Sequence, residues 1–134
     1  MSETFLLEVF TPDKLFMSQP VRQVVFSSSS GRLGVMNGHM PMISNVMDDS
    51  LDIQMEDGNW REAAASEGFM EVLPEVVRFF LDAVEWADEI DVVRAREALV
   101  RASGRLQGKL SHLEYVRTHA AITRAMTRLK VAQK

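Results

Sequence analysis

A chain of 134 residues, 46% of them hydrophobic, is long enough to bury one hydrophobic core, and its lack of cysteine excludes disulfides and argues against a thiolate zinc site. The net charge of −4 is uneven, because residues 1–83 carry 5 Lys and Arg against 13 Asp and Glu, whereas residues 84–134 carry 10 against 6. No run reaches the roughly 20 apolar residues of a membrane span, and the amino terminus has no basic residue before Lys14, unlike a targeting peptide, so we expect the protein to stay where it is made.

The first 83 residues consist of short apolar runs separated by turn residues, which is the pattern of β-strands. Asp57-Gly58 predicts a tight hairpin turn, and Pro74-Glu75 predicts another. In residues 21–29, the face that carries Val24 and Phe26 is expected to point to the core. Strands are expected at residues 4–10, 21–29, 51–55, 60–66, 69–73 and 76–82, with a short apolar piece at residues 15–17. About eight to ten strands this short could not cover both faces of one open sheet, so the pattern favours a sandwich.

Glycine and proline crowd residues 31–46, where Gly31, Gly34, Gly38 and Pro41 require turns or close backbone approach. A phosphate-binding loop is disfavoured, since no Gly-Lys-Ser/Thr sequence follows and no helix is predicted to begin here. We therefore expect a turn-rich end of the sandwich. Its methionines either form a partner-binding surface or fill the core. The residues expected to be exposed there are Met36, Asn37, His39, Met40 and Met42.

The last third of the sequence predicts two helices. Asp91 is expected to cap the first, whose apolar residues recur three and four positions apart on one face, at Val92, Ala95, Leu99, Ala102 and Leu106. The second is expected at residues 112–131, with an apolar stripe at Val116, Ala120, Ile122, Thr123, Ala125, Leu129 and Ala132. Alanine-rich stripes and a bend at residues 104–111 predict an antiparallel pair. The fold class is therefore an all-β sandwich (residues 1–84) followed by a C-terminal antiparallel α-helical hairpin (residues 85–134).

Charged side chains are expected to converge on one end and flank of this hairpin. With the turn near Gly108, antiparallel pairing brings two arginines of the second helix within about one helical turn of Asp91 and Arg94, and Arg101 lies on nearly the same face. Four guanidinium groups that repel one another would favour binding of an anionic ligand. The carboxylates would accept hydrogen bonds from its hydroxyl or amine groups. The alternative is that Asp91 only caps the helix while Arg94 and Arg101 pair with Glu97. The candidate set is Glu85, Asp91, Arg94, Arg101, Arg124 and Arg128.

The sequence offers no assembled catalytic centre. The three histidines, His39, His112 and His119, are scattered, and the last two, seven residues apart on a helix, are too distant to share a metal ion. No paired carboxylates and no nucleophile beside a base can be placed. We therefore expect no enzymatic activity, no metal and no required cofactor.

Five segments, in order, resemble one family. FLLEVFTPDKLFMSQPV is similar to that family's opening strands, GRLGVMNGHMP to its Gly-x-x-Gly-Val-x-Pro-Gly-His-x-Pro loop, and EGFMEV to its Gly-Phe-x-Glu-Val strand. IDVVRAREAL and RAMTRLKVAQK are similar to its two helices. On these segments, which span nearly the whole chain, the protein resembles the epsilon subunit of the F-type ATP synthase, called delta in mitochondria.

The resemblance implies a non-catalytic rotor subunit of the central stalk, which binds the gamma subunit and the ring of c subunits. The complex would hold it peripherally on the cytoplasmic face of the bacterial inner membrane or, alternatively, on a plastid thylakoid. In this family the hairpin either folds against the sandwich or extends into the catalytic alpha/beta hexamer, where it inhibits ATP hydrolysis. By analogy, the c ring would meet a loop that contains Arg32, Asn37, Gly38, His39 and Met40.

Some bacterial members of the family bind ATP as a regulatory ligand on the folded hairpin. They do so through an Ile-Asp-x-x-Arg-Ala motif and arginines of the second helix, and the resemblance carries this role onto matching positions of this sequence. Those positions are Glu85, Asp91, Arg94, Arg101, Arg124 and Arg128.

The basic C-terminal part leaves one alternative function, a small nucleic-acid-binding module. Against it, the basic tail from Val92 onward contains only Tyr115 as an aromatic residue for stacking on bases, and the protein as a whole is acidic. We therefore expect no nucleic-acid partner.

Overall fold

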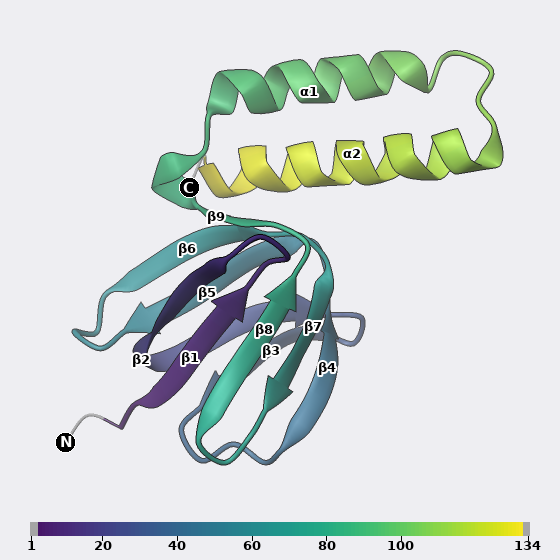
Figure 1. The fold of residues 1–134 in the computed structure, drawn as a ribbon. Helices are drawn as coiled ribbons and strands as arrows, with labels where there is room; N and C mark the ends of the chain where they lie inside the picture. Colours follow the sequence, from purple (N-terminus) through teal and green to yellow (C-terminus); the bar gives the residue numbers. More distant parts are fainter. Residues whose placement is uncertain (1–2, 133–134) are drawn as a thin grey trace.

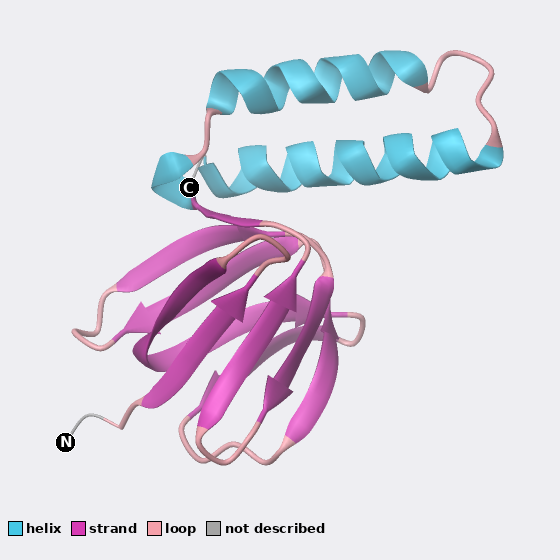
Figure 2. Cartoon of the chain, viewed as in Figure 1, coloured by secondary structure: helices cyan, strands magenta, loops and turns pink. Residues whose placement is uncertain are grey.

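A computed structural model describes residues 3–132, which form a β-sandwich followed by two packed helices (Figures 1 and 2). The strands are β1 (Phe5–Phe10), β2 (Leu15–Ser28), β3 (Gly31–Met36), β4 (Met42–Val46), β5 (Asp49–Met55), β6 (Trp60–Ala65), β7 (Gly68–Val72), β8 (Val76–Leu81) and β9 (Val84–Trp86). A 3₁₀ turn, η1 (Ala87–Glu89), leads to α1 (Val92–Arg105) and α2 (His112–Ala132). This architecture confirms the predicted fold class. The final two residues of the RAMTRLKVAQK segment lie outside the described residues.

The long strand β2 joins the two layers of the sandwich, because it pairs in both. Its first half, to Val21, pairs with β1, and its second half pairs with β3 and β5. The register shifts between Val21 and Gln23, where the strand passes between layers. One layer has the order β4-β7-β8-β1-β2 and the other β3-β2-β5-β6-β9. Pro20 is tolerated inside this strand because Pro20 itself pairs only with β1, opposite Leu6.

Residues 31–46 differ from the prediction, since they form β3 and β4 rather than a turn-rich end. Gly31, the first residue of β3, and Gly38, in the turn after it, have φ angles of 123° and 83°, which suit glycine. Between them, Val35 is 1% exposed and packs into the core. Two glycines within six residues lower the strand propensity of β3. For this reason the sequence did not predict a strand here.

The hydrophobic core lies between the two layers and is complete without the helices. Val24 and Phe26 are buried as predicted, and the Phe26 ring meets the Phe79 ring edge-on with centroids 5.2 Å apart. The buried core cluster runs from Leu7 to Trp86 and contains no residue of α1 or α2. The strand β9, which includes Glu85 and Trp86, continues the sheet two residues past residue 84, where the sequence predicted the boundary.

Both helices begin with hydrogen-bonded caps. Asp91 caps α1 as predicted, because its Oδ1 accepts a hydrogen bond from the Arg94 N–H at 3.1 Å. At the start of α2, the Ser111 hydroxyl accepts from the Glu114 N–H at 3.2 Å, and the Glu114 carboxylate accepts from the Ser111 N–H at 3.4 Å. This reciprocal pair is a capping box, so both helix starts are determined by the local sequence.

The hairpin is folded against the sandwich, with α2 lying between α1 and the strands β6 and β5 (Figure 1). Because α2 packs on two neighbours, its buried residues do not form the single predicted stripe. Val116, predicted on that stripe, is 47% exposed. Ala125 is buried as predicted, and the other buried residues of α2 are Thr118, Thr127 and Val131, which were not on the predicted stripe.

Candidate functional site

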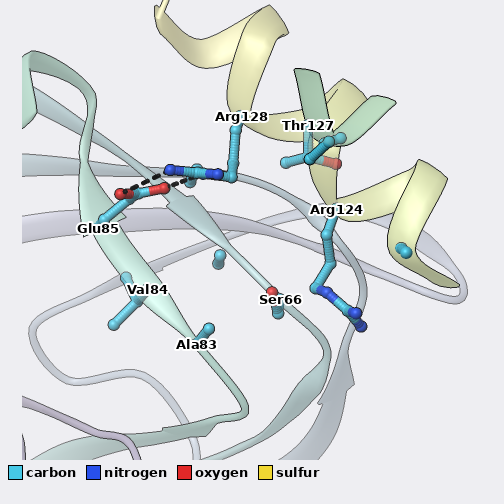
Figure 3. Close-up of a pocket in the computed structure, with 12 residues that line it drawn as sticks. Ser66, Ala83, Val84, Glu85, Arg124, Thr127 and Arg128 are labelled. Carbon is cyan, nitrogen blue, oxygen red and sulfur yellow. Dashed lines mark hydrogen bonds and ion pairs between the residues drawn. The ribbon is translucent and has the colours of Figure 1, made fainter. Parts of the chain in front are cut away.

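A pocket of about 400 Å³ lies between α2 and the edge of the sandwich, a volume within the range of small-molecule sites. Small side chains from both sides leave the space open, namely Ala64, Ala65, Ala83, Ala98, Ala121 and Ala125. The polar lining consists of Ser66, Glu85, Arg124, Thr127 and Arg128 (Figure 3). An apolar cleft with a few convergent polar groups can orient a ligand that has both a flat apolar part and charged groups.

Glu85 and Arg128 meet across this pocket (Figure 3). The strand β9 holds Glu85 beside α2, where its Oε2 accepts from Arg128 Nη2 at 3.4 Å and its Oε1 accepts from Arg128 Nε. Both side chains are partly shielded, at 31% exposure. Arg124, one helical turn earlier on α2, is exposed and forms no ion pair within residues 3–132. Of the two arginines in the pocket, Arg128 is neutralised by Glu85, whereas Arg124 is free to bind an anion.

The structure brings three of the six predicted residues together and leaves the other three outside the pocket. Glu85, Arg124 and Arg128 line it. Asp91 is occupied as the cap of α1, and Arg94 and Arg101 are exposed on that helix. The reason is that α1 packs on the outer side of α2, away from the sheet. Neither Arg94 nor Arg101 forms an ion pair with Glu97 in the part of the chain that the structure describes.

On the sandwich side of the pocket, only Glu85 was predicted from the sequence. Ala64 of β6, whose side chain points away from the sandwich core, allows α2 to approach the sheet, and Ser66 and Thr127 add hydroxyl groups to the lining. A small residue at an outward-facing strand position indicates close approach of a neighbouring element, so the sequence contained this information.

The five residues expected to form one partner-binding loop lie at opposite ends of β3. Arg32 is not in the loop but near the start of the strand, where it forms ion pairs with Asp52 at 2.9 Å and Asp49 at 3.5 Å. Asn37, Gly38, His39 and Met40 follow the end of β3, about 17 Å further along the strand. That loop lies beside the β7–β8 turn, and Met40 is 78% exposed.

An aromatic stack covers the outer face of the β1-β8-β7 layer. Phe80 pairs in register with Phe10 on one side and with Phe69 on the other, and the ring centroids are 5.3 Å and 5.0 Å apart. Phe79 points into the core, so its neighbour Phe80 points outward. Phe69 is 49% exposed, and a shallow groove of about 720 Å³ runs along the stack beside Met47. An exposed apolar groove of this size is typical of an interaction surface.

Two family models match consecutive parts of the chain. The beta-sandwich domain of the ATP synthase delta/epsilon chain matches residues 4–87, and the long alpha-helix domain of the same chain matches residues 88–133. The chain belongs to the ATP synthase delta/epsilon family. The ATP synthase epsilon chain of Ruminiclostridium cellulolyticum is 44% identical over 131 residues, which cover 98% of this chain and 97% of that protein. The epsilon chain of Caldanaerobacter subterraneus subsp. tengcongensis is 38% identical over 134 residues, covering 100% and 97%.

Solved structures show the same delta/epsilon fold. A chain of the Euglena gracilis mitochondrial ATP synthase, in a structure of OSCP, F1 and c-ring, aligns with a TM-score of 0.82 at 20% identity and covers 100% of this chain and 83% of that one. A chain from the central stalk and c-ring of the Tetrahymena thermophila mitochondrial enzyme aligns with a TM-score of 0.68 at 12% identity, covering 96% of each.

Residues 3–132 contain neither a candidate membrane span nor a candidate metal cluster. No helix among them is long and apolar enough to span a membrane. No three His, Cys, Asp or Glu side chains in the same range gather as possible metal ligands.

Proposed function

We propose that this chain is the epsilon subunit of an F-type ATP synthase, a rotor subunit of the central stalk with no active site of its own. The match of both family domains, in order and over residues 4–133, carries this conclusion. The relatives span nearly the same length and come from bacteria, which supports a position on the cytoplasmic face of the bacterial plasma membrane, held there by the complex.

The gamma subunit is the proposed partner of the aromatic stack. Three phenylalanines aligned across neighbouring strands form a rigid apolar surface, and exposed aromatic side chains of this kind act as anchors in protein interfaces. The loop of residues 37–41, with its exposed Met40, is proposed to meet the c ring at the end of the sandwich.

Phe69→Ser should weaken binding of the gamma subunit about tenfold or more, because the variant removes an aromatic anchor while leaving the core intact. The measurement is the dissociation constant for gamma by biolayer interferometry. Trp60→Ser is the matched control, since Trp60 is 50% exposed on β6 in the other layer. Equal losses for both variants would argue against the aromatic stack as the gamma surface.

The helical hairpin is proposed to regulate ATP hydrolysis by the alpha/beta hexamer, with ATP as a ligand that holds it folded. The pocket touches both β9 and α2, so a molecule bound in it stabilises the folded hairpin. At a hundredfold excess over the dissociation constant, this stabilisation is about 2.7 kcal/mol. In the folded state described here, Glu85, Arg124 and Arg128 form the proposed site, and Asp91, Arg94 and Arg101 lie outside it.

Arg124→Ala should weaken ATP binding by about 1.5–3 kcal/mol, because it removes a charge-assisted hydrogen bond to phosphate. Titration calorimetry of the full chain with ATP measures the change. Arg117→Ala removes an exposed arginine of the same helix outside the pocket and should bind ATP as the wild type does. A wild-type chain that binds no ATP at millimolar concentration would contradict the nucleotide site without touching the stalk assignment.

The nucleic-acid alternative gains no support from the structure. Two basic side chains of α2 are engaged by carboxylates of the sandwich, Arg128 by Glu85 and Lys130 by Asp49. They do not form a free basic surface with interleaved aromatic rings.

A further inference from the structure

The contacts that hold the hairpin on the sandwich concentrate in the last two turns of α2. Arg128 pairs with Glu85 at the pocket, and Lys130 Nζ donates to Asp49 Oδ1 at 2.9 Å. Val131, which is 1% exposed, packs with Ala64 of β6 and with Ile90 just before α1. The hairpin is therefore anchored at one end.

Asp49 is held ready for Lys130 by the sandwich alone. Its Oδ2 accepts from the Ser27 hydroxyl at 2.5 Å, and its Oδ1 accepts from the Ser50 N–H at 2.7 Å. Partial burial alone would raise the pKa of Asp49, but hydrogen bonds from Ser27, Lys130 and the Ser50 N–H outweigh it and lower the pKa to about 2. The acceptor is thus a fixed, ionised carboxylate, whereas Lys130 is 58% exposed and can leave it.

The segment that leads into the hairpin is clamped to the sandwich. The Arg61 guanidinium lies 3.8 Å from the centre of the Trp86 ring, whose other neighbour is the Phe16 ring at 4.9 Å. Arg61 also pairs with Asp88 in η1 at 3.8 Å. The chain is therefore held to the sandwich through Asp88. Beyond it, Ile90 is buried against Ala64 and Val131, so residues 89–91 become free to pivot once α2 leaves the sandwich.

We propose that Lys130 and Asp49 form an electrostatic latch, separate from the nucleotide pocket, which keeps the hairpin on the sandwich, and that the clamp at Trp86 places the hinge at residues 89–91. The latch needs neither ATP nor a partner subunit. Because Lys130 is largely solvated, salt weakens the latch, and the released hairpin swings as a unit about the hinge.

The absence of cysteine allows a direct measurement of the released population. A thiol introduced by Ala64→Cys, at 5% exposure under α2, is labelled when the hairpin leaves the sandwich. A thiol introduced by Ala63→Cys, at 0% exposure in the sandwich core, is labelled when the sandwich itself unfolds. Comparing the two labelling rates separates release of the hairpin from global unfolding.

Lys130→Gln should accelerate labelling at position 64 up to about fivefold, as expected for loss of one largely solvated ion pair, and leave position 63 unchanged. Raising sodium chloride from about 0.05 to about 0.5 M should accelerate labelling at position 64 with Lys130 present and have a smaller effect in the variant. Lys109→Gln is the matched control, since it removes an equally charged, exposed residue at the hairpin turn and should change neither rate.

For Lys130→Gln, either of two labelling results would overturn the latch: an unchanged rate at position 64, or equal acceleration at positions 63 and 64. If the two residues act as a pair, adding Lys130→Gln to Asp49→Asn should cause no further acceleration. The double variant should then be labelled at position 64 at the same rate as Asp49→Asn alone. Additive effects would show that the two residues act separately and would also contradict the proposal.

Discussion

Gly68→Ala will lower the free energy of unfolding of the sandwich by about 3 kcal/mol, at the upper end of the range for overpacking. A Cβ at this position would lie 2.0 Å from the Phe80 carbonyl oxygen and 2.9 Å from Leu81 Cα. Both atoms belong to the backbone of β8, which pairs with β7 through Gly68 and Leu81, so neither can move without shifting the strand. Urea unfolding followed by circular dichroism measures the loss.

Gly104→Ala is the matched control for this variant. The added Cβ meets no atom within 4 Å near the end of α1, and alanine favours the helix by about 1 kcal/mol over glycine. The same change of one methyl group should therefore destabilise at position 68 and stabilise at position 104. Equal unfolding midpoints for Gly68→Ala and the wild type would show that β8 can yield and that the close approach is not a constraint.

Removing the hairpin by truncation after Asp88 should leave a folded sandwich that still binds gamma but no longer inhibits ATP hydrolysis. The core cluster lies within Leu7 to Trp86, and the Arg61–Asp88 ion pair is retained, so the truncated chain keeps its packing. Added to the alpha/beta hexamer with gamma, the truncated chain should permit hydrolysis several-fold faster than the full-length chain does.

The ATPase rate of this reconstituted complex measures the effect, with gamma binding by both forms as the control. If both forms bind gamma and support the same rate, the hairpin has no inhibitory role. If the truncated form fails to bind gamma, the aromatic stack does not suffice for the stalk contact.

The sequence predicted those parts of the fold that local interactions determine, namely which strand face is buried and where a helix begins. Alternating apolar residues placed Val24 and Phe26 in the core, and the side chain of Asp91 determined the start of α1. The strand β3 was missed because Gly31 and Gly34 weaken its pattern, although pairing with β2 overrides that weakness. Strand propensity is a property of the local sequence, whereas β3 forms because the neighbouring strand β2 offers it hydrogen-bonding partners.

The candidate site was predicted in part for a similar reason. Antiparallel pairing of two helices gives the level of each residue along the axis, and it placed Arg124 and Arg128 at the correct end of the hairpin. It does not give the rotation of α2 about its axis, which depends on how the helix packs against Ala64 of β6. The two arginines therefore face Glu85 and the sandwich, while Arg94 and Arg101 remain on the outer helix.

The central claim, membership in the rotor stalk, is tested most directly by binding between the purified full-length chain and the gamma subunit of the same synthase. We predict that the two proteins coelute from a size-exclusion column as a stable complex at micromolar concentration. Separate elution of both folded proteins under these conditions would contradict the assignment.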